Sequence, residues 1–243
     1  MNKVAKITLA FWILKIIATT MGETLGDYFS QTLNLGYYIG LAITFLFFAI
    51  AASMQILSKK YNPYLFWLCI VSTTTFGTEI SDFIDRTLNM GYWGGSILLL
   101  SVLLLSLRFW FKKYKNLEVY PIISKDKELL YWTAILFSNS LGTAFGDFLG
   151  DNIGLSYFQG AMVSGGIIII VILLHYFSKI NSVVLFWIAF IFTRPFGATF
   201  GDFLTKPLAK GGLDLGTLNA SVVCGILLFF IITISNRKVK LEK

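Results

Sequence analysis

Charged residues are scarce in this chain of 243 residues, because Asp, Glu, Lys and Arg together make up only 14% of it. Soluble domains contain about 25% of these residues. A soluble protein of this length needs a polar surface that such a composition cannot supply. Intrinsic disorder is excluded as well, since 56% of the residues are hydrophobic and 16% are aromatic. The class that remains is a polytopic membrane protein.

Cysteine and histidine are almost absent. The two cysteines, Cys69 and Cys224, lie in apolar runs, which argues against a disulfide scaffold. The single histidine, His175, leaves too few soft ligands for a zinc or copper site. Nucleophile elbows, nucleotide-binding loops and zinc-protease motifs are missing from the sequence. We therefore expect neither an enzyme nor a bound cofactor.

Long apolar runs occupy most of the chain. A membrane-spanning helix needs about 20 largely apolar residues, and eight runs qualify. They are residues 6–29, 37–58, 63–85, 92–113, 129–150, 156–178, 182–204 and 214–236. The first run continues into a polar motif and has no small-residue cleavage site, so we interpret it as a span and not as a signal peptide. The sequence predicts an all-α protein with eight transmembrane helices.

Basic residues predict how the helices are oriented. With eight spans, most Lys and Arg residues lie on the side of the two termini, whereas the opposite connections carry only Arg86, Lys206 and Lys210. The positive-inside rule then places both termini in the cytoplasm. We expect a multi-pass protein of the cytoplasmic (inner) membrane. The net charge of +7 reflects topology and contact with anionic lipids, and we expect no nucleic-acid partner.

A pattern of Trp, Gly and Asp recurs four times along the chain. An aromatic residue and a Trp begin each odd-numbered run, a glycine follows ten residues after the Trp, and an aspartate follows fifteen residues after it. The four Trp–Gly–Asp sets are Trp12, Gly22 and Asp27; Trp67, Gly77 and Asp82; Trp132, Gly142 and Asp147; Trp187, Gly197 and Asp202. Since each copy holds two spans, the copies share one orientation and form a parallel repeat.

The spacing between copies divides the chain into two halves. The Trp residues of successive copies are 55, 65 and 55 residues apart, and the ten extra residues fall in the basic middle connection. We therefore expect a first membrane half at 1–117, a cytoplasmic linker at 118–126 and a second membrane half at 127–243. Each half contains two helix-hairpin repeats.

Acidic residues in the repeated motif indicate a site. A carboxylate inside the hydrocarbon costs about 2.5–3.5 kcal/mol on insertion scales, so four at one depth call for a function. If the Trp residues lie at the inner interface, fifteen helical residues raise the aspartates by about 22 Å, into the outer third of the bilayer. Two further acids, Glu23 and Glu79, lie four and three residues before an aspartate, on the same helix face.

The composition of this site favours a hard cation, because carboxylate oxygens suit Mg²⁺, Ca²⁺ and Mn²⁺. The predicted metal ligands are Glu23, Asp27, Glu79, Asp82, Asp147 and Asp202. A structural role for these acids at the outer interface is the alternative. The glycines next to them either lie in continuous helices or break the helices, and the sequence leaves both arrangements open.

Arg194 is the unusual member of the fourth copy. It occupies the position that Thr19, Thr74 and Asn139 hold in the other copies. An unpaired charge at that depth is costly, so we expect Arg194 to pair with a motif carboxylate. Its role is either plain neutralisation or that of a built-in cation that occupies or gates the acidic site when substrate is absent.

The motifs themselves resemble those of a known family. Glu-Thr-Leu-Gly-Asp at 23–27, Gly-Thr-Ala-Phe-Gly-Asp at 142–147 and Thr-Arg-Pro-Phe-Gly-Ala-Thr-Phe-Gly-Asp at 193–202 resemble the bacterial integral membrane proteins labelled uncharacterised membrane-anchored protein. That label implies no activity. A looser similarity links Glu23 and Asp27 to the Glu-x-Gly-Asp motif of manganese/calcium cation–proton exchangers. The spacing here is one residue longer, and Tyr28 replaces the basic residue of that motif.

These observations predict a transporter of a hard divalent cation of the Mn, Mg and Ca class, with proton exchange on the carboxylates coupling its movement. One alternative is a cation channel in which the four aspartates form a selecting ring. Another is a membrane scaffold protein that transports nothing and uses the acids for packing. The expected partners are the cation, protons and the lipid bilayer, and the sequence leaves a homo-oligomer open.

Overall fold

The computed structural model describes residues 2–241, and for 238–241 it describes the backbone only. All regular elements in that range are helical, which confirms the all-α prediction. The range contains eight long α-helices: α1 Leu9–Asp27, α2 Gly36–Leu57, α3 Pro63–Asp82, α4 Gly91–Tyr114, α5 Lys125–Asp147, α6 Tyr157–Phe177, α7 Ser182–Thr205 and α8 Thr217–Leu241. Each expected apolar run forms one of these helices.

The odd-numbered helices share a start signal. In each of them the residue before the helix accepts a hydrogen bond through its side chain from a backbone N–H of the first turn. These capping residues are Thr8, Asn62, Ser124 and Asn181. A side-chain oxygen at this position satisfies an N–H group that has no partner within the helix. The caps therefore fix where each motif-bearing helix begins.

A tight turn leads from the first odd-numbered helix to the even-numbered helix that follows it. Asn34 and Gly36 both have positive φ, at 52° and 73°. Asn and Gly adopt this left-handed conformation at low cost. The same pair of conformations recurs at Asn89 with Gly91 and at Asp214 with Gly216. The Asn-x-Gly sequence of the first two copies is thus a turn that reverses the chain.

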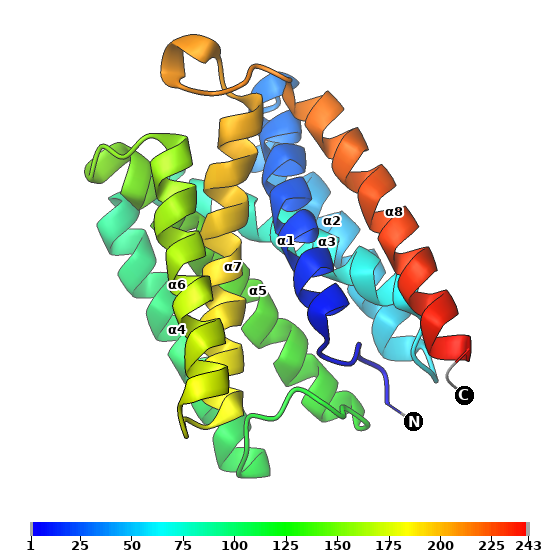
Figure 1. Cartoon of the computed structure of the whole chain (residues 1–243). Helices are drawn as coiled ribbons and strands as arrows, with labels where there is room; N and C mark the ends of the chain where they lie inside the picture. Colours follow the sequence, from blue (N-terminus) through cyan, green and yellow to red (C-terminus); the bar gives the residue numbers. More distant parts are fainter. Residues whose placement is uncertain (1, 242–243) are drawn as a thin grey trace.

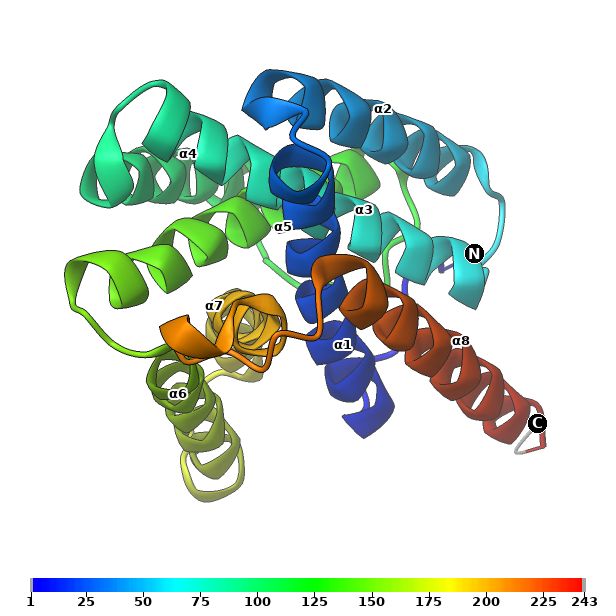
Figure 2. The same ribbon diagram turned by 90° about the horizontal axis from the view of Figure 1, so that it is seen from above.

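Helices α1, α3, α5 and α7 form a closed ring. Each packs against the next one, and α7 packs back against α1. Outside the ring, α2 packs on α3, α4 on α5, α6 on α7 and α8 on α1, as Figure 2 shows. The repeats therefore follow one another around a single axis, and the fourth repeat closes on the first.

The outer helices carry the apolar surface of the molecule. Leu46 of α2, Leu105 of α4, Ile169 of α6 and Phe230 of α8 are all more than half exposed. In the most apolar stretch of α4 only 22% of the residues are buried, against 61% in the corresponding stretch of α7. Side chains of this kind on a long helix are expected to face lipid.

Six helices within the described residues are long and apolar enough to cross a membrane, namely α1, α2, α4, α6, α7 and α8. The apolar runs of the sequence predict eight. Helices α3 and α5 are less apolar because polar residues fill their middle, including Thr73 and Thr74 in α3 and Ser138 and Asn139 in α5. All four of these side chains are buried inside the ring.

The bundle has two distinct ends. Figure 1 shows both labelled chain ends at the same end of the molecule. We call this the Trp end, because the odd helices begin there with Trp12, Trp67, Trp132 and Trp187. The opposite end is the motif end, which holds Asp27, Asp82, Asp147 and Asp202.

Candidate functional site

The inner helices approach most closely at the glycine ten residues after each Trp. A Cβ atom added to Gly22 would overlap the side chain of Thr74, and one added to Gly142 would lie 2.5 Å from Cβ of Arg194. The same relation joins Gly77 to Asn139 and Gly197 to Thr19. These glycines lie inside unbroken helices, so their role is close packing of the ring.

Three of the motif helices change shape directly after the aspartate. Helices α1, α3 and α5 end at their aspartates and continue as five-residue π-helical turns: η1 Tyr28–Thr32, η2 Phe83–Thr87 and η3 Phe148–Asn152. Helix α7 instead runs on to Thr205, and a short 3₁₀ turn, η4 Leu208–Lys210, follows. π-Helical turns are rare and occur frequently at functional sites. Their recurrence after the aspartates therefore indicates a functional site at this end of the helices.

Arg86 bridges two of the aspartates. Its Nε atom lies 3.5 Å from Asp82, four residues earlier in the same segment, and its guanidinium donates a hydrogen bond of 3.1 Å to Asp147 of α5. Arg86 also donates to the hydroxyl of Tyr37, at 2.9 Å. Both carboxylates are buried, with 2% and 9% of their surface exposed. One cation therefore joins the second repeat to the third.

Lys206 bridges the other two aspartates in the same way. Its ammonium group lies 2.5 Å from Asp27 and 3.3 Å from Asp202, which is four residues earlier in the chain. Gln31 takes part as well, since it donates to Asp27 at 2.6 Å and accepts from Lys206 at 3.3 Å. This second cation joins the fourth repeat to the first.

The two bridging cations occupy equivalent positions in alternate repeats. Arg86 and Lys206 each follow the aspartate of their own repeat by four residues, whereas this position holds Gln31 in the first repeat and Asp151 in the third. From the sequence, Arg86 and Lys206 are predicted only as loop charges, without these pairings. The signal was present, because a cation four residues after an acid shares its helix face.

Arg194 lies deeper in the ring and is completely buried. Its guanidinium donates a hydrogen bond of 2.7 Å to Glu23, and it also donates to the hydroxyl of Thr78 and to the backbone carbonyl of Thr19. The pairing with a motif acid therefore agrees with the expectation from sequence. These contacts tie α7 to both α1 and α3.

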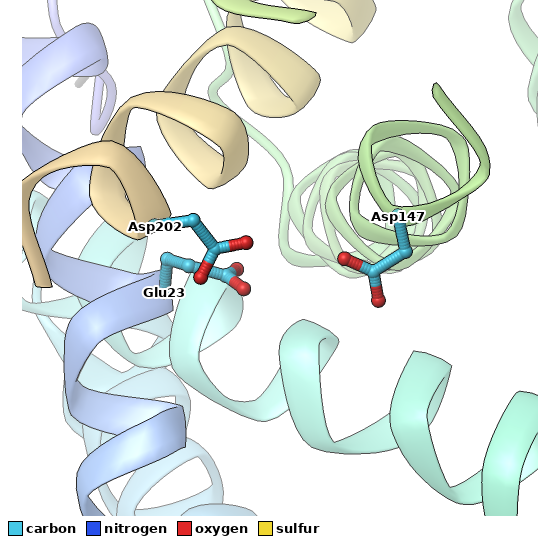
Figure 3. A group of neighbouring side chains, drawn as sticks. All are labelled: Glu23, Asp147 and Asp202. Atoms are coloured by element: carbon cyan, nitrogen blue, oxygen red, sulfur yellow. The ribbon is translucent and has the colours of Figure 1, made fainter. Parts of the chain in front are cut away.

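Three carboxylates from three different helices come together at the motif end. One oxygen each of Glu23 (α1), Asp147 (α5) and Asp202 (α7) lie within 4.8 Å of one another. In Figure 3, Glu23 and Asp202 lie side by side, and Asp147 faces them from across a gap. Each offers an oxygen ligand, so this carboxylate trio is the group best placed to hold a metal ion.

A cavity of about 560 Å³ opens beside the trio. Asp147 and Asp202 lie in its wall together with Arg86 and Lys206, and Tyr92 contributes a hydroxyl that donates to Asp151 at 2.6 Å. The polar lining is formed largely by the third and fourth repeats. A hydrated ion therefore has a wide, polar approach to two carboxylates of the trio.

Glu79 takes a different place from the one expected for it. Its carboxylate lies against Gly40 of α2 and Gly26 of α1, and it is fully buried. Neither of its oxygens has a hydrogen-bond partner among the described residues. The carboxylate trio does not include it, nor does it include Asp27 or Asp82, which are held by Lys206 and Arg86.

Below the acidic groups, the middle of the ring contains a second buried cation. Lys15 of α1 is fully buried, and its ammonium group donates to the side-chain carbonyl of Asn139 at 2.8 Å. It also lies 4.0 Å from the centre of the Phe190 ring, a cation–π contact. Asn139 in turn donates to Thr73 at 3.0 Å. This network links α1, α3, α5 and α7.

The Trp end is filled by aromatic rings. The first aromatic residue of one repeat packs against the Trp of the next: ring centres are 5.5 Å apart for Phe11 and Trp67, and 5.6 Å apart for Phe66 and Trp132. Phe186 and Trp12 close the circle at 5.6 Å, and Trp110 fills the step between Tyr131 and Trp187. Three of the four motif Trp residues are thus buried in the ring and do not face lipid.

Comparison with known proteins gives one match. A family model described as Repeat of Unknown Function (DUF347) matches the chain four times, at residues 10–61, 65–116, 130–181 and 185–238. The chain therefore belongs to this family, and the four copies seen in the sequence are confirmed. No curated protein matches. No solved structure matches either, so neither the similarity to cation–proton exchangers nor the membrane-anchored label gains support.

Proposed function

We propose that this member of the DUF347 repeat family is a transporter of the cytoplasmic membrane, and that it carries a hard divalent cation of the Mn²⁺, Mg²⁺ and Ca²⁺ class. In this proposal all eight long helices cross the bilayer, and both termini lie in the cytoplasm. The four inner helices enclose the path of the ion. The carboxylate trio at the motif end binds it.

The proposed eight spans rest on the ring itself. Helices α3 and α5 pack between α1 and α7 and carry α2 and α4 on their outer sides, so lipid has little access to them. A helix shielded in this way tolerates polar residues that a lipid-facing helix does not. Their lower hydropathy is therefore compatible with spanning the membrane. The excess of Lys and Arg on the side of the termini supports the orientation.

The observation that carries the proposed activity is the carboxylate trio beside an open polar cavity. Oxygen ligands from three separate helices favour Mn²⁺, Mg²⁺ or Ca²⁺ over softer metals. Charge supports a divalent ion as well. The buried carboxylates of Glu23 and the four motif aspartates outnumber their paired cations, Arg86, Arg194 and Lys206, by two. A divalent cation neutralises this excess.

The packing at the Trp end favours a carrier over a channel. The aromatic rings close the inner ring of helices on that side, while the cavity opens on the other. An ion bound at the trio therefore leaves toward the Trp end only after those rings part. A channel with a ring of four free aspartates fits less well, because Arg86 and Lys206 hold all four.

The test measures binding and flux of Mn²⁺ with purified protein. Titration calorimetry in detergent gives the affinity, and entry of Mn²⁺ into proteoliposomes, with and without a pH gradient, gives transport and its coupling. Asp147→Asn and Asp202→Asn each remove a charged ligand, so we expect about 100-fold weaker binding or more. Asp126→Asn is the matched control, since this exposed acid on α5 pairs only with Lys113 in the described structure.

Two results would contradict the proposal. One is a wild-type protein, monodisperse and folded, that neither binds nor transports Mn²⁺, Mg²⁺ or Ca²⁺. The other is Asp147→Asn with wild-type affinity and flux. The first result would leave the scaffold interpretation, in which the acids serve packing alone. The second would show that the carboxylate trio is not the ion-binding site.

A further inference from the structure

Every carboxylate of the trio already holds a cation of the protein's own. The pairs are Glu23 with Arg194 at 2.7 Å, Asp147 with Arg86 at 3.1 Å and Asp202 with Lys206 at 3.3 Å. An incoming metal ion must compete with these resident cations for the same oxygens. How firmly each cation is held therefore decides which carboxylates become available.

The three resident cations differ in their freedom to move. Arg194 has no exposed surface, and its further hydrogen bonds to Thr19 and Thr78 fix it in the ring. The side chains of Arg86 and Lys206 are 34% and 22% exposed and lie in the wall of the cavity. These two have open space beside them, whereas Arg194 has none.

The two freer cations also have a second carboxylate, outside the trio, to hold them. Lys206 contacts Asp27 at 2.5 Å, closer than its 3.3 Å contact with Asp202, and the side-chain carbonyl of Gln31 is also within reach. A cation that leaves the trio on this side keeps an ionic partner, which avoids the cost of a stranded buried charge.

The other side of the site has the same layout, but Arg86 lies closer to the trio carboxylate of Asp147, at 3.1 Å, than to Asp82. Arg86 contacts Asp82 at 3.5 Å and donates to Tyr37, so it also keeps partners when it leaves Asp147. The site therefore has twofold character. In each half one aspartate belongs to the trio and the other lies outside it, with a cation between the two.

We propose that Arg86 and Lys206 are displaceable counter-ions, and that the four repeated aspartates have two different roles. This inference rests on the proposed function. When the divalent cation binds, Arg86 moves from Asp147 onto Asp82, and Lys206 moves from Asp202 onto Asp27. Asp147 and Asp202 are then metal ligands, whereas Asp27 and Asp82 retain the displaced cations.

A double-mutant cycle on Asp27 and Lys206, with Mn²⁺ affinity from calorimetry as the readout, tests this division of roles. Lys206→Gln removes a competitor, so we expect about tenfold tighter binding. Asp27→Asn leaves Lys206 with Asp202 as its only carboxylate, so we expect about tenfold weaker binding. The double variant Asp27→Asn/Lys206→Gln has no cation to retain, and we expect it to bind at least as tightly as the wild type.

Lys210→Gln provides the matched control, because it makes the same charge change at the rim of the same cavity, where Lys210 is exposed. This variant reports the general effect of removing one positive charge on Mn²⁺ affinity. We expect it to raise the affinity less than Lys206→Gln does. An equal gain would overturn the proposal. A double variant that stays as weak as Asp27→Asn would also overturn it, because Asp27 would then be a ligand.

Size-exclusion chromatography and thermal unfolding show whether each variant folds. If a variant of Asp27 or Lys206 does not fold, the same cycle on Asp82 and Arg86 tests the proposal in its place. The design also separates the two proposals. If the wild type binds Mn²⁺ and Asp147→Asn does not, the site stands, and the cycles judge the counter-ions alone. If neither the wild type nor any variant binds, the proposed function fails first.

Discussion

The two ends of the inner ring are built from the same four helices and yet are filled mainly by different groups. The motif end holds buried carboxylates, their cations and a cavity of about 560 Å³. The Trp end, fifteen residues and about 22 Å away along each helix, is packed with aromatic rings that contact one another from repeat to repeat. The fourfold repeat therefore does not by itself determine whether polar or aromatic side chains fill the ring at a given depth.

The comparison also shows where the symmetry of the repeats changes. At the Trp end three of the four steps around the ring use the same aromatic–Trp contact. At the motif end the bridging cations come only from the second and fourth repeats, so the site is twofold. We infer that the Trp end mainly contributes stability and the motif end mainly contributes chemistry.

The largest expected effect on stability comes from truncating a ring at the Trp end. Trp132 is 2% exposed and packs against Phe66 and Tyr131. Trp132→Ala is expected to lower the free energy of unfolding in detergent by about 3–5 kcal/mol, because it leaves a large cavity. Mn²⁺ affinity is expected to stay unchanged. Trp93→Ala is the control, since Trp93 is 64% exposed on α4. We expect a much smaller loss in the free energy of unfolding for this variant.

A smaller effect is expected where the inner helices touch between the two ends. Gly142→Ala places a methyl group 2.5 Å from the Arg194 side chain, so we expect a loss of about 1–3 kcal/mol from overpacking. Gly166→Ala makes the same change on α6, where nothing lies within 4 Å. Chemical unfolding of both variants gives the comparison. Equal stability of the two would contradict the close packing described for the ring.

The smallest expected effect is that of a substitution at Glu79, which is buried with no hydrogen-bond partner for its oxygens among the described residues. Glu79→Gln keeps the shape, and its amide lacks partners at this position as well. We therefore expect a change of less than about 1 kcal/mol in the free energy of unfolding, with unchanged Mn²⁺ affinity. Loss of Mn²⁺ binding in this variant would return Glu79 to the ligand set that the sequence suggested.

Sequence reasoning predicted the helices and the repeat well, because the Trp-to-Asp spacing and the apolar runs are local features. The place of Glu79 depends on a single residue of helix spacing, which the sequence pattern did not resolve. Glu23 lies four residues before its aspartate and joins the trio, whereas Glu79 lies three residues before and faces Gly40 of α2. One residue turns a side chain by about 100°, and only the packed ring shows which direction is inward.

Other features depended on contacts between distant repeats. The sequence does not reveal that Arg86 reaches Asp147 or that Lys206 reaches Asp27, because these partners are 61 and 179 residues apart. The sequence likewise does not reveal that the polar residues in the middle of α3 and α5 are buried by neighbouring helices of the ring. The pairing of Arg194 was predictable, since a completely buried charge requires a counter-charge.

Anomalous diffraction from crystals grown with Mn²⁺ tests the central claim most directly, because it locates the ion without relying on a functional assay. Our account predicts one strong peak between the carboxylates of Glu23, Asp147 and Asp202, with Lys206 drawn away from Asp202 toward Asp27. A peak bounded instead by Glu79, or no peak at a saturating Mn²⁺ concentration, would contradict it.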